Sequence, residues 1–361
     1  MRHFPAMGVR PARLRACALA TALVAALAPA PRATAQDAVE DAERRDDFAF
    51  GGPIELQDTF LPAQTRPQPF AESAAPMPAG AVALRVVGDW TNHFADTDTY
   101  LFDGESVTTT WRLRVAPWNG VELGVDLPWT ARFDGTLDPF IENVEDALDA
   151  RVRERFQRPR DSWDAIVVRE DGSRRMRLRE TDRVGDVVLH AKLGLARADR
   201  HAFDAAIAAS LGLPSGAASF GGEGVSPGLA LHLQKPFETL NLFAGAGLQH
   251  YTDATEQSLR LAPFRWMTYA GAEWRPWRSW LGLVFQYQVY GRLARTNDPL
   301  DDPAHYYAVG LRLHLPARVT LEATMIENLG LIENRNSSDV AFHFGVGWQF
   351  QLPGLGANAQ P

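Results

Sequence analysis

Apolar and polar residues alternate one by one over long parts of this chain. The last such stretch, 340–350, has small or polar residues at every second position, and the positions between them are all apolar: Val340, Phe342, Phe344, Val346, Trp348 and Phe350. A strand with this period turns the two sets of side chains to opposite faces. Stretches 119–133 and 184–196 repeat the pattern. The alternation therefore predicts β-strands with one apolar and one polar face.

The same test predicts twelve strands, each about as long as a tilted strand that crosses a bilayer. They cover 81–94, 105–116, 119–133, 183–196, 201–213, 225–234, 239–251, 263–275, 279–293, 305–315, 318–328 and 339–350. The Gly and Ala content of 225–234 and 239–251 blurs their two faces. Ten and fourteen strands therefore stay open as alternatives, with strand ends placed to within ~2–4 residues.

Short and long connections alternate between these strands. The short ones are 118–119, 197–200, 235–238, 276–278 and 316–317, and the long ones are 95–104, 134–182, 214–224, 252–262, 294–304 and 329–338. Tight turns at one rim and longer loops at the other are typical of bacterial outer-membrane barrels. Hydrocarbon offers no partner for free backbone groups, so strands cross it only as a closed barrel. We therefore predict an all-β fold, a transmembrane antiparallel up-and-down β-barrel of about 12 strands, over 80–350.

The first 35 residues have the features of a secretory signal peptide. Several Arg residues precede the apolar run 16–28, and the stretch ends in Ala33-Thr34-Ala35, which predicts cleavage after Ala35. The only cysteine, Cys17, lies within it. No later stretch approaches the ~18 consecutive apolar residues of a membrane-spanning helix. With the predicted barrel, this signal indicates the outer membrane of a Gram-negative bacterium.

Residues 36–79 precede the first strand and are rich in proline, which cannot donate to a strand ladder. The segment retains large apolar residues at Phe60, Leu61 and Phe70. A mobile periplasmic tail would not need them, so packing inside the lumen is the favoured interpretation. Residues 351–361 form a short C-terminal tail.

The connection 134–182 is too long to be a plain loop. Within it, apolar residues recur at spacings of three and four, which predicts a helix: Ile141, Val144, Leu148, Val152 and Phe156. Stretches 165–168 and 176–178 flank Asp171-Gly172, which is typical of a hairpin turn. We expect a structured extracellular insertion that covers the rim, and a partner or ligand site on it is the alternative.

Composition alone resembles that of a soluble protein, with 46% apolar residues, a mean hydropathy of −0.20 and a net charge of −8. No run of basic residues is interleaved with aromatic residues, which argues against a nucleic-acid partner. The polar faces of the strands carry both signs of charge, as in a salt-bridged interior or a weakly selective channel. The candidate lumen-lining residues are Arg112, Arg114, Glu122, Asp126, Asp186, His190, Lys192, Glu273, Arg312, Glu322 and His343.

Catalytic and metal sites find little support in the sequence. A barrel hydrolase needs a Ser beside a His at the rim, and no Ser is expected beside His250. Acidic loops that contain Asp301, Asp302 and His305 resemble ordinary solvated surface, and the histidines lack metal-ligand spacing. We predict no catalytic residue, metal or cofactor.

The function predicted from the sequence is that of a narrow channel or transporter for a small solute. Its expected partners are outer-membrane lipid and the barrel assembly machinery. A structural or surface-interaction barrel that acts through 134–182 is the alternative, and an outer-membrane enzyme is less favoured.

Five short motifs together resemble an uncharacterised proteobacterial family, domain of unknown function 3187. They are Thr65-Arg66-Pro67-Gln68-Pro69-Phe70, Gly185-Asp186, Leu213-Pro214-Ser215-Gly216, Glu327-Asn328-Leu329 and Asn336-Ser337-Ser338-Asp339-Val340-Ala341-Phe342-His343. The resemblance covers about 50–350 and implies an outer-membrane barrel without assigning an activity. One feature departs from the usual barrel pattern. Barrel assembly signals generally end the chain on an aromatic residue, whereas here Gln351 to Pro361 follow Phe350.

Overall fold

The computed structural model describes residues 51–352 apart from 98, 149–158, 161, 169–174, 178–180, 199–200, 218–219, 253–254, 257–258, 277–279, 296–298 and 329–336. The predicted signal peptide, residues 36–50 and residues 353–361 lie outside the described residues.

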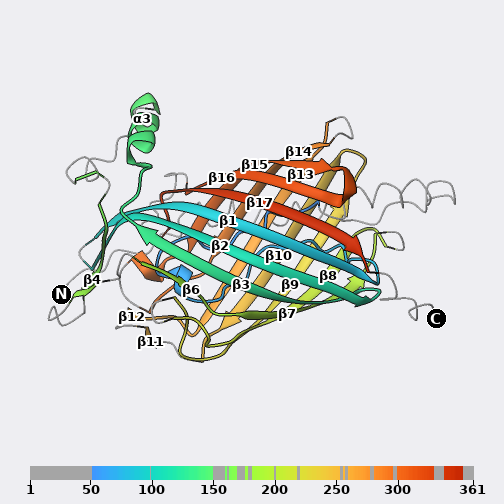
Figure 1. The fold of residues 1–361 in the computed structure, drawn as a ribbon, viewed down its shortest axis with the longest axis horizontal. Coiled ribbons are helices and arrows are strands. Elements are labelled where there is room, and N and C mark those ends of the chain that lie inside the picture. Colours follow the sequence, from blue (N-terminus) through green and yellow to red (C-terminus); the bar gives the residue numbers. More distant parts are fainter. Residues whose placement is uncertain are drawn as a thin grey trace, which may run out of the picture.

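Twelve long strands form one closed antiparallel ring (Figure 1). Each strand pairs with the next, and the ring closes where β17 pairs with β1, with Ala81 opposite Gln351 and Asn92 opposite Val340. The predicted twelve-stranded barrel is thereby confirmed. Its strands are β1 (Ala81–Asp96), β2 (Tyr100–Trp118), β3 (Val121–Phe133), β7 (Val188–Ala196), β8 (Asp204–Gly212), β9 (Ser226–Pro236), β10 (Leu240–His250), β13 (Phe264–Trp274), β14 (Leu281–Tyr290), β15 (Ala304–Leu315), β16 (Val319–Glu327) and β17 (Val340–Gln351).

The alternation in sequence becomes an alternation of burial. On β17, Phe344, Val346 and Trp348 are each about half exposed, whereas His343 and Gln349 are buried. An outward apolar band and a polar interior are what a strand needs when lipid lies on one side of it. In the part of the chain that the structure describes, no helix has the length and apolarity needed to cross a membrane.

One predicted loop, 95–104, is strand over most of its length. Strand β1 continues to Asp96 and β2 begins at Tyr100, so the two strands form a long hairpin that extends past the rest of the ring. Tyr100 and Phe102 are buried against Phe60 and other apolar side chains. The apolar residues of this stretch therefore face the protein interior, which the alternation rule for lipid-facing strands did not anticipate.

The predicted strand 183–196 is divided in two. Strand β6 (Thr181–Val184) pairs with the end of β3, and β7 pairs with its beginning, while 185–187 between them is irregular. The wall is thus interrupted at Gly185 and Asp186.

Helix α3 (Asp138–Leu148) and strands β4 (Asp164–Val168) and β5 (Arg175–Arg177) lie within 134–182. Strand β4 pairs with β5 and with β2. The helix lies outside the ring (Figure 1), where Leu137 and Ile141 pack against Trp90, Phe342 and Val340. The predicted helical positions Val152 and Phe156 and the turn at 171–172 lie outside the described residues. That this end faces the cell exterior remains a prediction.

Five short elements complete the part of the fold that the structure describes. They are strands β11 (Thr255–Glu256) and β12 (Leu259–Arg260) and the 3-10 helices η1 (Ala63–Thr65), η3 (Pro299–Asp301) and η4 (Pro316–Arg318).

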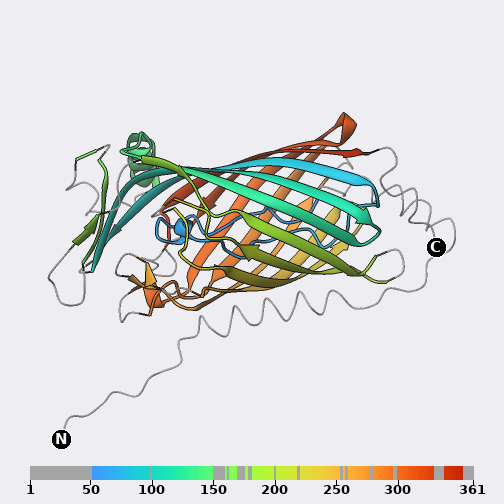
Figure 2. The same cartoon turned by 60° about the horizontal axis from the view of Figure 1, so that its bottom comes forward.

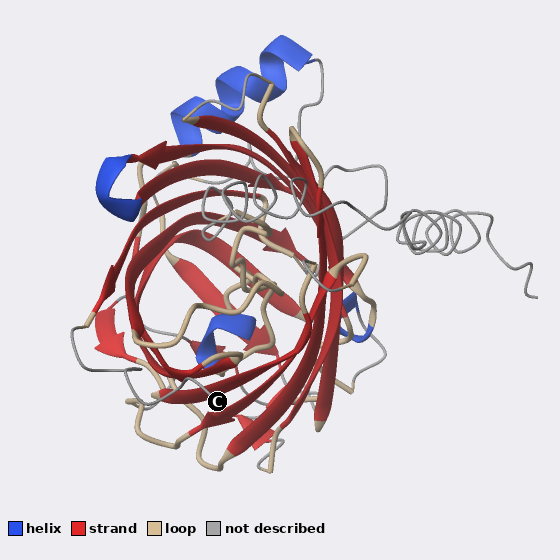
Figure 3. Ribbon diagram, turned by 90° about the vertical axis from the view of Figure 1, so that its right-hand side faces the viewer, coloured by secondary structure: helices blue, strands red, loops and turns tan. Residues whose placement is uncertain are grey.

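Residues 51–79, called the luminal segment below, lie inside the ring (Figure 2), and loop segments fill much of the interior in a view along the barrel (Figure 3). The rim with Gly80, Leu352 and the turn between β2 and β3 is the short-turn end, and the opposite rim is the long-loop end. The segment runs from the short-turn end past β13 to β15, turns at η1 near the long-loop end, and returns past β10 to β7. Both of its limbs therefore begin or end at the short-turn end.

Candidate functional site

All eleven residues predicted to line the lumen are buried. Arg112 and Arg114 lie on β2, Glu122 and Asp126 on β3, His190 and Lys192 on β7, Glu273 on β13, Arg312 on β15, Glu322 on β16 and His343 on β17, while Asp186 lies on the irregular stretch before β7. The structure brings ten of these residues, all except Asp186, into ion pairs with one another and with the luminal segment. The candidate site is therefore a polar interior that already contains part of the chain.

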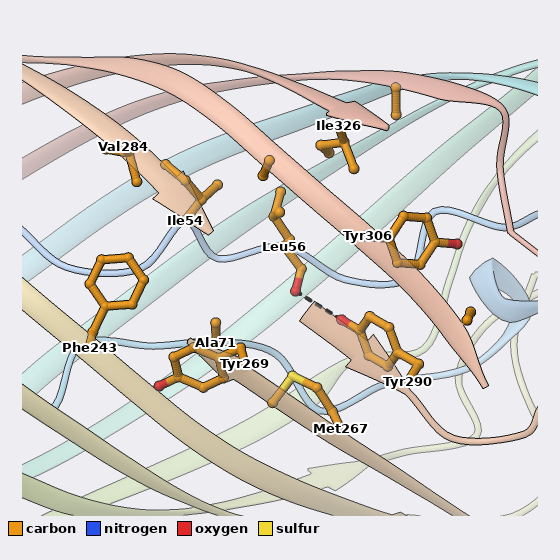
Figure 4. Packing of buried hydrophobic residues seen from close by; sticks show 13 residues of the cluster. Ile54, Leu56, Ala71, Phe243, Met267, Tyr269, Val284, Tyr290, Tyr306 and Ile326 are labelled. Carbon is orange, nitrogen blue, oxygen red and sulfur yellow. Dashed lines mark hydrogen bonds between the residues drawn. The ribbon is translucent and has the colours of Figure 1, made fainter. Parts of the chain in front are cut away.

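The first limb of the luminal segment, 51–59, is extended and has two different sides. Its backbone bonds to inward side chains of β14: the Ile54 amide N–H donates to Gln286 at 2.9 Å, and the Gln286 amide donates back to the Ile54 carbonyl at 3.1 Å. The Tyr290 hydroxyl donates to the Leu56 carbonyl at 3.1 Å (Figure 4). Side-chain groups of the wall thus replace the ladder partners that this isolated limb lacks.

Ile54 and Leu56 point to one side of this limb and pack in an apolar cluster with wall residues that include Met267, Tyr306 and Ile326 (Figure 4). Buried apolar area of this kind stabilises by roughly 25 cal/mol per Å². Glu55 and Gln57 point to the other side, toward β1, β2 and β3. The limb therefore adheres to one wall and presents polar side chains to the opposite wall.

Glu273 holds the start of this limb. Its carboxylate accepts the Gly52 N–H at 2.9 Å and pairs with Arg312 at 2.8 Å, Arg275 at 2.9 Å and His314 at 2.8 Å. Arg312 also donates to the Gly52 carbonyl at 2.9 Å. A fully buried carboxylate is stable only with several such partners.

Glu322 extends this network around the wall. It pairs with Arg312 at 3.1 Å, with Arg85 and with His343 at 3.0 Å. The other ring nitrogen of His343 lies 2.7 Å from Asp89. Four predicted residues, Glu273, Arg312, Glu322 and His343, thus form one connected cluster across β13 to β17.

At the turn of the segment, Asp58 binds Arg265 and accepts a hydrogen bond from the Tyr306 hydroxyl at 2.5 Å. Phe60 and Leu61 then pack with Tyr100, Phe102 and further buried residues near the long-loop end. Large apolar residues at 60 and 61 are thus accounted for by contacts inside the protein.

The second limb, 66–79, fits against glycines of the wall. A Cβ atom built at Gly212 would lie 2.5 Å from Pro67, one at Gly247 would lie 2.8 Å from Pro69, and one at Gly194 would lie 3.1 Å from Pro76. Of these three glycines, Gly247 lies on β10, one of the two strands whose faces were blurred by Gly and Ala content in the sequence, and it leaves the space that Pro69 occupies. Proline suits such a limb because it has no backbone N–H that would need a hydrogen-bond partner.

Glu72 holds the second limb to β7. Its carboxylate lies 3.3 Å from the Lys192 ammonium and 3.1 Å from the His190 ring. Lys192 also pairs with Glu122 at 3.0 Å, and Glu122 accepts the Met77 N–H at 2.8 Å. Glu122, His190 and Lys192 therefore act as attachment points for this limb.

Asp186 differs from the other predicted residues because it organises a connection. Its carboxylate accepts the backbone N–H groups of Ser215, Gly216 and Gly222, at 2.8 to 3.1 Å. These bonds draw the β8–β9 connection toward the lumen, where Phe220 stacks 3.9 Å from the Arg132 guanidinium.

Two cavities remain between the luminal segment and the wall formed by β1, β2 and β3. The first is nearer the long-loop end and is lined by residues that include Thr108, Thr110 and Asp126. The second is nearer the short-turn end and is lined by residues that include Arg112 and Arg114. Positions 108, 110, 112 and 114 are successive inward positions of β2, so the cavities follow one another along the same strand.

Arg112 lies at the boundary between the two cavities. Its guanidinium binds Glu55 of the first limb and lies 4.4 Å from the ring centre of Phe70 on the second limb. Beside it, Arg114 pairs with Asp126 at 3.1 Å. The Arg112 side chain thus reaches from the wall to both limbs of the luminal segment between the two cavities.

The sequence did not identify Glu55, Asp58 and Glu72 as site residues. They lie in a proline-rich segment without periodicity, so no pattern gave their orientation. One signal could have identified them. Basic side chains on the inward strand faces need acidic partners once they are buried, and a segment packed in the lumen can supply these partners. Among the described residues, no group of three or more His, Cys, Asp or Glu side chains is arranged to hold a metal ion.

Solved structures with similar folds include outer-membrane proteins. The COG4313 outer membrane channel from Pseudomonas putida F1 aligns with a TM-score of 0.51 and 13% identity, over 76% of this chain and 97% of that chain. The P. putida toluene transporter TodX aligns with a TM-score of 0.36 and 12% identity, over 75% of this chain and 89% of that chain. A Pseudomonas aeruginosa FadL homologue aligns with a TM-score of 0.39 and 9% identity, over 83% of this chain and 100% of that chain.

Sequence comparison adds the family. No curated protein matches the chain. The model of the family described as a protein of unknown function, DUF3187, matches residues 44–350, the range over which the short motifs resemble it. The chain therefore belongs to the DUF3187 family.

Proposed function

We propose that this protein is a channel of the Gram-negative outer membrane that passes a small solute along the wall formed by β1, β2 and β3. The observation that carries the proposal is the pair of cavities that follow one another along β2, on either side of Arg112. The luminal segment adheres to the opposite wall through its apolar cluster and leaves this side polar. The passage then opens when the contacts of Arg112 with the luminal segment are released.

The orientation follows from the connections. Short turns of outer-membrane barrels face the periplasm and long loops face the exterior, so the luminal segment enters from the periplasmic side and 134–182 is extracellular. Lipid contacts the outward apolar band, and the barrel assembly machinery inserts the strands.

Single-channel recording tests the proposed path. The only cysteine of the chain is Cys17, so a cysteine placed in the barrel is a specific probe once the signal peptide is absent. In planar bilayers, we expect small ohmic current steps from the full mature chain and from Thr108→Cys. A charged thiol reagent should reduce the current of Thr108→Cys, because this side chain lines the first cavity.

Thr324→Cys is the matched control, since Thr324 is an inward threonine of β16, on the wall to which the luminal segment adheres. The reagent should leave its current unchanged. Equal loss of current in both variants would contradict the path along β2, and absence of current from the mature chain and from a chain that lacks 36–79 would contradict the channel itself.

A further inference from the structure

The carboxylate of Glu55 forms ion pairs with two arginines of the wall. Its two oxygens face Arg85, at 2.8 Å, and Arg112. The Arg112 side chain is 3% exposed and that of Glu55 is 15% exposed. Two guanidinium groups that converge on one carboxylate form an arrangement that recognises this group by charge-assisted hydrogen bonds.

Glu55 is a more important counter-ion for Arg112 than for Arg85. Arg85 also binds Glu322, whereas the other acid near Arg112 is Asp126, whose oxygen lies 3.9 Å from the Arg112 Nε. That Nε atom is buried without a hydrogen-bond partner among the described residues. If Glu55 moves away, a buried guanidinium loses its main counter-ion, which is costly unless another anion replaces it.

Space for another anion lies directly beside this pair. The second cavity is lined by four basic side chains, Arg85, Arg112, Arg114 and Lys192, and by three acidic ones, Glu55, Glu72 and Glu122. Withdrawal of Glu55 leaves four basic side chains against two acidic ones. Gln349 lines the same cavity, is 2% exposed, and neither atom of its side-chain amide has a partner among the described residues.

We propose that Arg112 and Arg85 form a binding site for small carboxylate solutes, and that Glu55 of the luminal segment occupies this site in the closed channel. The inference rests on the proposed channel function and adds its substrate class. A solute carboxylate takes the place of the Glu55 carboxylate, so binding and opening are coupled through competition for the same arginines. The free amide of Gln349 provides hydrogen bonds for a second polar group, as in a dicarboxylate.

The test uses Glu55→Gln, which removes the competing charge from the full mature chain. In planar bilayers with chloride salts, we expect Glu55→Gln to conduct more than the unaltered protein. Succinate should reduce this chloride current, and the neutral analogue succinamide should not. Adding Arg112→Gln should raise the succinate concentration needed for half block by about tenfold, the effect of losing one charge-assisted pair.

Glu72→Gln is the matched control, because Glu72 is the acidic residue of the other limb and binds Lys192 and His190. With Glu55 still in place, this variant should gain no block by succinate. Equal block by succinate and succinamide, or a half-block concentration that Arg112→Gln leaves unchanged, overturns the carboxylate site while leaving the channel intact.

Calorimetric titration of succinate into detergent-solubilised Glu55→Gln, with and without Arg112→Gln, measures the site without any current. Binding that requires Arg112, in a protein without conductance, supports the site and overturns the channel. No heat of binding to the folded variant overturns the site. Folding is checked by heat-modifiable migration. If Glu55→Gln does not fold, Glu55→Asp takes its place in the test, because its shorter side chain falls short of the arginines.

Discussion

The interior of this barrel illustrates how buried charges depend on their partners. Alternation along a strand predicted that Glu273, Arg312 and Lys192 face inward, because the side of a strand follows from its period alone. Some of their partners stand directly opposite them on the neighbouring strand, such as Glu322 beside Arg312 and Glu122 beside Lys192. Other partners come from the luminal segment, as with Gly52, which donates to Glu273, and the path of this irregular segment is not given by any local pattern.

Glu273→Gln should destabilise the barrel more than other changes of a single charge. The side chain is fully buried and has Arg312, Arg275 and His314 as partners, so its neutralisation leaves buried positive charge without compensation. Loss of one partner of a buried pair costs about 3–5 kcal/mol. The measurement is the urea concentration at which half of the protein loses its heat-modifiable migration in detergent.

Glu223→Gln is the control for this prediction, since Glu223 is exposed on the β8–β9 connection. Changes of exposed charges usually alter stability by less than ~0.5 kcal/mol. A Glu273→Gln midpoint equal to that of Glu223→Gln would show that the network around Glu273 does not hold the luminal segment.

At the scale of elements, the strands could be predicted and the luminal segment only in outline. Strands that face lipid on one side carry a period of two whatever their partners are, which is why β17 was placed almost to the residue. The rule failed at 95–104, where Tyr100 and Phe102 face Phe60 and not lipid. The proline-rich segment kept large apolar residues, which indicated packing, but its path depends on glycines of three other strands.

Gly247→Val should displace the second limb from the wall. A Cβ atom at this position would lie 2.8 Å from the Cβ of Pro69, and one of the two groups must move. Valine suits a strand, so the wall is expected to persist and the limb to shift. We expect faster cleavage within 51–79 by a non-specific protease and a larger unit conductance.

Gly88→Val offers the matched control, because a Cβ atom at Gly88 on β1 has no heavy atom within 4 Å. Its cleavage rate and conductance should equal those of the unaltered protein. If both variants behave alike, the contact of Pro69 with the wall does not position the limb.

At the scale of the whole molecule, the ring of twelve paired strands leaves its apolar side chains on the outside. Residues such as Val309, Leu229 and Trp348 are about half exposed or more. Exposed apolar surface of this extent requires lipid or detergent. The overall composition concealed this division, because the outward apolar band and the polar interior average to the values of a soluble protein.

We therefore expect the mature protein to be extracted only with detergent and to migrate faster on gels before heating than after it. A closed barrel resists mild detergent because every strand of the ring has two partners. The control is the same sample boiled before loading, which should migrate at the unfolded position. A protein that is monodisperse in buffer without detergent would contradict the membrane assignment.

The path of the luminal segment has a consequence for assembly. Its described ends, at Gly51 and Ala79, both lie toward the short-turn end, and it turns back at η1 before reaching the opposite mouth. Residues 51–79 are therefore not threaded through the ring. This segment can enter after β17 has closed on β1, and it can leave again without separating any pair of strands. Barrel closure and insertion of the segment can thus take place as two separate steps, and only the second has to be reversible for the proposed channel to open.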